Sequence, residues 1–475
     1  MITLLPYALF ISIIFVGALV AGALAFPGER ATSVILCIMG FMFATLKIWL
    51  IQQTPQWHDV MLDARQYQLQ AQAFADHWHG LAVDVDRMRV LGLQSRGQGT
   101  WPPNLNLPYS SIFGTHEWLF SAYLAVWKVI SPNWFLWASY ANAAFSAFFP
   151  AAAFGIARSL GAGRRVSILA GAAALFDPAA AVNGAWLLKD TLAGWLAIGA
   201  IWAGIRMRES RGLWVFVIFI IFTGFLGAVR FAALVAIFFA CTAVALIFVF
   251  QRRWRCAANF GISPAFALLI FALFCALPLS ADRVEQLNPF SSVTSIVRGQ
   301  HETFVTTSSN NAASDETVID WRNRLSENPI RALFTSASRT LFAPYPWVAI
   351  THGLSYDNGF ELYYMGMILW IFCLPGILWS IINKVVRPTI PYVFILCILG
   401  SAFAGYTLFL GEWSTRQRVF LLPVFFALAA IGWADLHARW RERHRPNRRI
   451  GPLIPNRATD GKTSSLKLDL DSSGV

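Results

Sequence analysis

Long apolar segments recur along this chain, and they decide what it can fold into. The runs are about 20 residues long, and a helix of that length crosses the roughly 30 Å hydrocarbon core of a bilayer. The composition agrees, because 57% of the 475 residues are hydrophobic and only 13% are charged. We therefore predict an all-α, polytopic integral membrane protein with about eleven transmembrane helices. The expected spans are residues 4–26, 32–51, 134–157, 166–183, 187–205, 213–228, 231–250, 260–279, 364–383, 388–410 and 418–437.

The distribution of charge between the spans predicts their orientation. The net charge of +12 is concentrated in short connections and toward the C-terminus, and Lys and Arg are enriched on the cytoplasmic side of membrane proteins. Two long connections lack this excess: 53–117 has four Lys/Arg against six Asp/Glu, and 280–345 has six against seven. We place both connections on the outer side of the cytoplasmic (inner) membrane of a bacterium. We expect no binding of nucleic acid.

These charges also predict how the chain is divided. Residues 1–437 should form the membrane domain, and 438–475 a basic, disordered cytoplasmic tail. Within the domain, 53–133 is the first outer loop and 280–345 the second, both with short interfacial helices. The apolar segment 118–130 is short and contains Lys128, so we expect it to lie at the interface. A crossing there would put the first outer loop on the cytoplasmic side.

The first outer loop contains the segment most suggestive of chemistry. Asp63 is followed at helical spacing by Tyr67 and Phe74, so the three side chains should share one side of a helix. A carboxylate at the boundary between membrane and water can accept a proton from a hydroxyl. The alternative is that Asp63 caps this helix. His58 and Asp59, about one turn earlier, are further candidates for the same role.

Charged residues at the ends of later spans suggest an anion site. Lys189 precedes Asp190 at the start of a span, and a cation there is unfavourable unless an anion is near; a phosphate would supply that anion. Arg230 lies alone between two apolar spans, where an arginine is costly unless it pairs. Asp63 and Asp190 could share a divalent cation if the fold brings them together, although no cluster with metal-ligand spacing is visible.

A second group of cations opens the last span. Arg416 and Arg418 are expected on the outer side, against the usual bias of positive charge, and Glu412 precedes them. A guanidinium offers several donors in a fixed fork that matches phosphate oxygens. We predict that these residues contribute to the same anion site.

Several of these motifs resemble those of the GT-C superfamily, the membrane glycosyltransferases that use polyprenyl-phosphate sugars and include protein mannosyltransferases and the lipid A aminoarabinose transferase. Asp63-Ala-Arg65-Gln-Tyr67 is similar to the Asp-x-x-x-Tyr of the superfamily's first outer loop. Lys189-Asp190 stands where many members have a charged pair. Arg230-Phe-Ala-Ala-Leu is similar to an Arg-Pro-Thr span opening without the proline. Arg416-Gln-Arg418-Val-Phe-Leu-Leu-Pro423 looks like Arg-Tyr-Arg-x-x-x-x-Pro.

The resemblance implies an inverting transfer of a sugar from a polyprenyl-phosphate donor to a hydroxyl of a lipid, glycan or protein acceptor, among membrane lipids on the outer face. Asp63 would be the general base, and Arg65 and Tyr67 would help to place the sugar. Lys189, Arg230, Arg416 and Arg418 would hold the departing phosphate. Asp190 and Glu412 complete the predicted substrate-binding set. No cofactor is implied beyond the divalent cation considered above.

Two other functions are open. An O-antigen or polysaccharide polymerase or ligase would use pyrophosphate-linked lipids, and would need essential groups in the second outer loop, where the candidates are Arg283, Arg298, His301, Arg322 and Arg324. A transporter or lipid flippase would need polar residues at mid-membrane depth or repeated halves. The sequence shows few of the former and no clear repeat.

Overall fold

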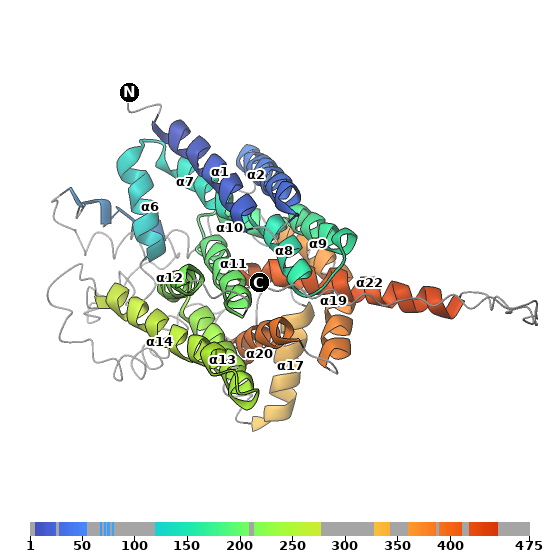
Figure 1. Ribbon diagram of the computed structural model, residues 1–475. Coiled ribbons are helices and arrows are strands. Elements are labelled where there is room, and N and C mark those ends of the chain that lie inside the picture. The colour runs from blue at the N-terminus through green and yellow to red at the C-terminus, as the bar shows by residue number, and fades with distance from the viewer. Residues whose placement is uncertain are drawn as a thin grey trace, which may run out of the picture. The chain divides into compact units, whose positions relative to one another are not determined.

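The structure is a computed structural model, and it describes residues 5–24, 28–54, 67–68, 71–72, 74–76, 78–79, 119–208, 213–276, 327–342, 360–385, 389–410 and 418–444. Within these ranges the chain is helical and contains no strand, which confirms the predicted all-α class (Figure 1). Seven helical segments are long and apolar enough to cross a membrane: Leu5–Gly22, Arg30–Gln53, Trp134–Ser159, Arg164–Ala185, Phe231–Phe250, Trp254–Leu273 and Val419–His444. Shorter apolar helices occupy Leu119–Ile130, Leu213–Val229, Ile368–Asn383 and Ile390–Tyr406.

The chain divides into two compact units, Met1–Leu436 and His437–Val475. The first unit contains α1 (Leu5–Leu24), α2 (Arg30–Gln53), α6 (Leu119–Ile130), α7 (Trp134–Ser146), α8 (Phe149–Ser159), α9 (Arg164–Phe176), α10 (Ala179–Ala185), α11 (Asp190–Met207), α12 (Leu213–Val229), α13 (Phe231–Phe250), α14 (Trp254–Ala276), α17 (Pro329–Phe342), α19 (Phe360–Val385), α20 (Ile390–Leu410) and the 3₁₀ turn η4 (Val419–Leu421). The last helix, α22 (Leu422–His444), begins in this unit and continues into the region where the basic tail was predicted.

Two of the predicted spans are each built from two helices. The segment predicted at 134–157 is α7 followed by α8, with Pro150 in the first turn of α8. The segment predicted at 166–183 is α9 followed by α10, interrupted at Asp177-Pro178. Proline disfavours helical backbone at the residue before it, so α9 ends where the sequence requires. This interruption places the buried carboxylate of Asp177 at the boundary between α9 and α10.

The centre of the first unit is α11. Fourteen residue positions along this 18-residue helix are buried, and α11 packs against α7, α8, α10, α12 and η4. A helix that is apolar on nearly every side is typical of a protein core or a membrane span, and the burial of α11 shows that other helices surround it. Small residues permit close packing: a Cβ added to Gly194 would overlap the ring of Phe149. The position of Asp190, at the start of this helix, is therefore set by the elements that surround α11.

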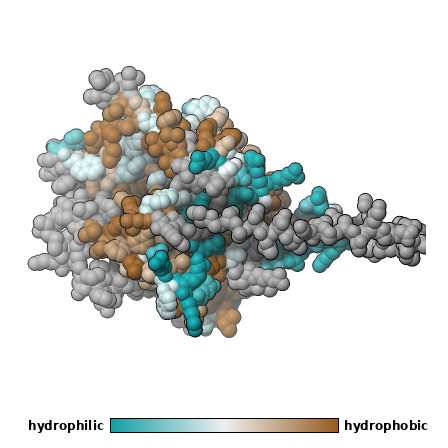
Figure 2. Space-filling model, viewed as in Figure 1, coloured by the Kyte–Doolittle hydropathy of each residue, from teal (hydrophilic) through white to brown (hydrophobic). Residues whose placement is uncertain are grey.

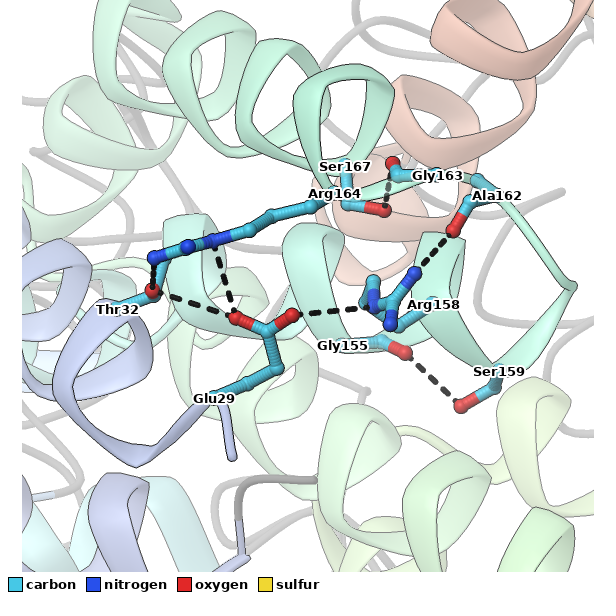
Figure 3. Close-up of polar contacts among 9 residues, drawn as sticks. All are labelled: Glu29, Thr32, Gly155, Arg158, Ser159, Ala162, Gly163, Arg164 and Ser167. Carbon is cyan, nitrogen blue, oxygen red and sulfur yellow. Dashed lines mark hydrogen bonds and ion pairs between the residues drawn. The ribbon is translucent and has the colours of Figure 1, made fainter. Parts of the chain in front are cut away.

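One end of the bundle, which we call the Glu29 end, is marked by a carboxylate between two arginines. Glu29 precedes α2, and its carboxylate lies 3.6 Å from Arg158 Nε and 3.3 Å from Arg164 Nε (Figure 3). The hydroxyl of Thr32 accepts a hydrogen bond from Arg164 at 3.1 Å. The connection before α2 and the connection between α8 and α9 therefore lie side by side.

The opposite ends of α2 and α9 are joined by Lys47. Its ammonium donates hydrogen bonds to the carbonyl oxygens of Leu175 at 2.5 Å and Asp177 at 2.7 Å. The carbonyls at the C-terminal end of a helix need donors, and Lys47 supplies them where α9 ends. At 1.5 Å per residue, about 26 Å of α2 separates Lys47 from the start of the helix. That length is close to the thickness of the hydrocarbon core.

Apolar side chains also cover much of the outside of the described helices. Ile11, Phe15 and Leu19 of α1 are each more than half exposed, and apolar residues form a large part of the coloured surface in Figure 2. Contiguous apolar surface of this kind is unfavourable in water and is expected where helices meet lipid. The structure thus supports a membrane protein, while the total of about eleven spans stays a prediction.

Candidate functional site

The start of α11 is held by a tight buried turn. Leu187, between α10 and α11, has a φ of 54°, in the left-handed region that branched residues rarely adopt. Its backbone is supported from α7, where Asn142 Nδ2 donates to the Leu188 carbonyl at 3.1 Å and Ser139 Oγ donates to the Ala185 carbonyl at 3.1 Å. Buried carbonyls need such donors. The turn presents Lys189 and Asp190 in a defined orientation.

Asp190 forms an ion pair with Arg230. The carboxylate at the start of α11 is fully buried, and it pairs with the Nη2 of Arg230, the residue between α12 and α13. Arg230 Nη1 also donates to the hydroxyl of Tyr406, on α20, at 2.6 Å. A charge removed from water is tolerated only when it is paired and hydrogen-bonded. The structure thus brings together two residues that the sequence predicted for the site.

Aromatic rings complete the surroundings of Arg230. Its guanidinium carbon lies 5.5 Å from the ring centroid of Phe420, in η4, and 5.9 Å from that of Tyr406. The face of an aromatic ring attracts a cation. The guanidinium, which comes from the α12–α13 junction, therefore contacts residues of α11, α20 and η4. We call this end of the bundle the Asp190 end.

Arg418 lies in a neighbouring pocket of the same end. It is 2% exposed, and its guanidinium carbon lies 4.4 Å from the ring centroid of Trp370, on α19. Asp177 lines this pocket together with the apolar side chains of Leu422 and Phe426. The space admits about one water molecule. A buried arginine and a buried carboxylate thus line a single narrow pocket.

Asp177 has a second role in its own turn. Its Oδ1 accepts a hydrogen bond of 2.7 Å from the backbone N–H of Ala179, at the start of α10. An Asp side chain that bonds the backbone two residues on stabilises a turn. The backbone carbonyl of Asp177 is meanwhile held by Lys47. Both contacts fix the carboxylate at the edge of the pocket that contains Arg418.

Tyr67 connects the first long loop with this end. The Nζ of Lys189 lies 5.7 Å from the Tyr67 ring centroid. The Tyr67 ring also packs edge-on against Phe120 of α6, with the centroids 5.3 Å apart at 85°. The segment that follows Asp63 is therefore anchored between α6 and the start of α11.

The structure places five of the predicted site residues at one end of the bundle. Lys189 lies over Tyr67, Asp190 pairs with Arg230, and Arg418 lies against Trp370. Arg418 is also two residues before Phe420, which contacts Arg230. The remaining predicted residues, Asp63, Arg65, Glu412 and Arg416, lie outside the described residues. The same is true of the candidates for a polymerase or ligase, namely Arg283, Arg298, His301, Arg322 and Arg324.

Several residues of this end were not included in the predicted site. Lys47, Trp370 and Tyr406 lie inside apolar spans, and only the isolated charge of Lys47 could have drawn attention. Asp177 is an acid before a proline in the sequence, but nothing local connects it with Arg418. In the part of the chain that the structure describes, no three His, Cys, Asp or Glu residues are grouped as metal ligands.

Comparison with models of protein families gives no match, and no curated protein matches the chain.

Proposed function

We propose that the chain is a membrane glycosyltransferase that moves a sugar from a polyprenyl-phosphate donor to an acceptor hydroxyl at the Asp190 end of the bundle. This end would face outward from the cytoplasmic membrane. The observation that carries the proposal is that three buried cations from separate parts of the chain, Lys189, Arg230 and Arg418, lie at this one end, with Lys189 over the ring of Tyr67. A lipid-linked phosphate is an anion that remains at the membrane surface, where such cations can meet it.

The balance of buried charge supports an anion as ligand. Among the described residues of this end, Lys189, Arg230 and Arg418 are buried cations, and Asp177 and Asp190 are buried carboxylates. The half-buried Lys47 adds a further cation. Buried cations stabilise an anion that binds beside them, because the poorly solvated surroundings strengthen the attraction. Arginine is well suited to this role, because its planar fork matches phosphate oxygens.

The proposed reaction is a single displacement. The acceptor oxygen forms a bond to the anomeric carbon while the bond from that carbon to the phosphate oxygen breaks, with inversion. The acceptor proton passes to Asp63, and the cations stabilise the phosphate that leaves with the bonding electrons. Positioning of the reactants and stabilisation of this charge would supply most of the rate.

The contact between Tyr67 and Lys189 supports Asp63 as the base. Asp63 precedes Tyr67 by four residues, and four residues of extended chain span at most about 14 Å. Chain connectivity alone therefore keeps Asp63 in the neighbourhood of the ring that Lys189 covers. Asp59, one turn earlier in the sequence, provides a matched acid for comparison.

The proposal is tested by Asp63→Asn in purified protein, with a radiolabelled polyprenyl-phosphate sugar as donor. Asn caps a helix about as well as Asp but cannot take up the proton. We expect normal yield and thermal stability, with sugar transfer reduced at least about 10²-fold, the usual scale for a lost general base. Asp59→Asn should transfer at a rate close to wild type. An Asp63→Asn protein that keeps more than about a tenth of the activity would show that Asp63 is a cap and not the base.

A further inference from the structure

The helix α17 has three chemically different sides. It begins after Asn328, whose Oδ1 accepts a hydrogen bond from the backbone N–H of Arg331 at 3.1 Å. This is a side-chain cap, with Pro329 at the first helical position. Each residue advances by about 100° around a helix. Positions three and four apart therefore share a side, and adjacent positions do not.

The first side of α17 is small and faces the bundle. Ala332 and Ser336 are one turn apart, and they are 2% and 0% exposed. The helix packs against α19 and α20. Small residues let two helices approach closely. This side attaches α17 to the rest of the first unit.

The second side is bulky, apolar and open. Ile330, Leu333 and Phe334 occupy positions i, i+3 and i+4, and they are 81%, 38% and 77% exposed. Arg331, which is also exposed, lies about 100° further around the helix. The helix packs on the bundle through its small residues and exposes an apolar side and a cationic side. This pattern is typical of a helix that lies at a membrane surface.

The neighbouring helix also exposes large apolar side chains. Ile368 and Phe372 of α19 are 57% and 68% exposed, and α19 is one of the two helices on which α17 is docked. Large exposed apolar side chains on both of these packed helices indicate lipid as the partner. The exposed Arg331 is complementary to lipid phosphates.

The end of α17 is attached to the Arg418 pocket. The indole N–H of Trp370 donates a hydrogen bond of 2.7 Å to the carbonyl oxygen of Leu341, in the last turn of α17. The same indole ring lies against the guanidinium of Arg418. Only one side chain therefore separates α17 from the buried arginine.

We propose that Ile330, Leu333 and Phe334 of α17 contact the acyl chains of membrane phospholipids, and that α17 forms the lipid-facing wall beside the Arg418 pocket. The occupant of this surface is bulk phospholipid, with Arg331 directed to the headgroups. The inference concerns a physical partner and does not depend on the proposed transfer reaction. If that reaction is correct, α17 lies where a lipid-linked donor would approach Arg418 from the membrane.

The test is photocrosslinking of the full chain in vesicles of phosphatidylcholine and phosphatidylglycerol. Phe334 is replaced by p-benzoylphenylalanine in one variant and Arg331 in a second, and adducts are identified by mass spectrometry after irradiation. Both positions are exposed on the same helix, so they differ chiefly in direction. We expect adducts to phospholipid acyl chains at position 334 in several-fold greater yield than at position 331, which is directed to the headgroups.

Two results would overturn the inference. One is an equal yield of acyl-chain adducts at the two positions. The other is a crosslink from position 334 to a second copy of the chain in place of lipid. The attachment to Trp370 is tested separately by Trp370→Phe, which removes the N–H and keeps an aromatic ring. Hydrogen exchange of residues 338–342 should become faster, and unchanged exchange would refute the attachment. Neither measurement uses a sugar donor, so failure of the proposed reaction would leave both results interpretable.

Discussion

Arg230 and Asp190 form an ion pair that joins the start of α11 to the junction between α12 and α13. Arg230 is 6% exposed and Asp190 is 0% exposed. Neither charge has bulk water to solvate it. The hydroxyl of Tyr406 and the ring of Phe420 complete the surroundings of the guanidinium. The pair therefore links four elements of the bundle through a single cation.

Removing one partner of this pair should destabilise the protein strongly. Arg230→Gln leaves the Asp190 carboxylate buried without its cation, and such a loss typically costs about 3–5 kcal/mol. We expect a clear drop in the midpoint of thermal unfolding in detergent. Arg165→Gln, at an exposed position, should change it little. The double variant Asp190→Leu/Arg230→Met should recover much of the loss, and a double variant less stable than either single one would contradict the pair.

Arg418 should contribute directly to binding of a lipid phosphate. A hydrogen bond to a charged group is worth about 1.5–3 kcal/mol, so Arg418→Ala should weaken binding of polyprenyl phosphate roughly ten- to a hundred-fold. Arg418→Lys should recover part of the affinity, since it restores the charge without the fork. Native mass spectrometry of the detergent-solubilised protein measures the bound fraction. Arg165→Ala, at an exposed position of the Glu29 end, serves as the control for loss of a cation. Equal affinity of the wild-type and Arg418→Ala proteins would exclude this site.

The crossing of α19 and α22 depends on two glycines. A Cβ on Gly432 would overlap the backbone carbonyl of Gly376, and backbone cannot rotate away as a side chain can. Gly432→Ala should therefore destabilise by about 1–3 kcal/mol, the usual range for overpacking. Gly400→Ala is the matched control, because nothing lies within 4 Å of a Cβ there. Alanine at this helical position should be neutral or stabilising. Equal unfolding midpoints for the two variants would refute the close crossing.

The proposed orientation predicts which positions an impermeant maleimide can reach in intact cells. Gln94→Cys and Ser309→Cys should react, because both lie in the loops that we expect outside. Arg165→Cys, at the Glu29 end, should react only after lysis. Protection of both loop positions in intact cells would reverse the orientation, and with it the proposed outward site.

The fold class could be predicted because apolar length is a local property. The spans predicted at 32–51 and 231–250 differ from α2 and α13 by at most a few residues. The helix predicted at 118–130 is present as α6, whose 12 residues are too few to cross the bilayer alone. Its place at the interface remains a prediction. The span at 187–205 illustrates the limit of this reasoning, because hydropathy could not show that α11 is surrounded by other helices.

The site could be predicted only one residue at a time. An arginine between apolar spans must find a partner, so Arg230 was recognisable, but its partner was not. An acid at the start of a helix complements the helix dipole, so the sequence alone explains Asp190 without a partner, and only tertiary structure shows that it pairs with Arg230. Trp370 and Tyr406 are unremarkable in an apolar sequence. Their contribution depends on how distant helices pack, which periodicity does not encode.

The order of the residues in the chain has a consequence for biogenesis. Arg230 follows Asp190 by 40 residues, whereas Tyr406 follows Arg230 by 176. Synthesis proceeds from the N-terminus, so the carboxylate can be neutralised as soon as α12 and α13 enter the membrane. The hydroxyl and the ring of Phe420 arrive only after most of the chain has been made. A ribosome-bound intermediate that ends after α13 should therefore contain the ion pair but not the finished site, and insertion of the last helices is the step that completes it.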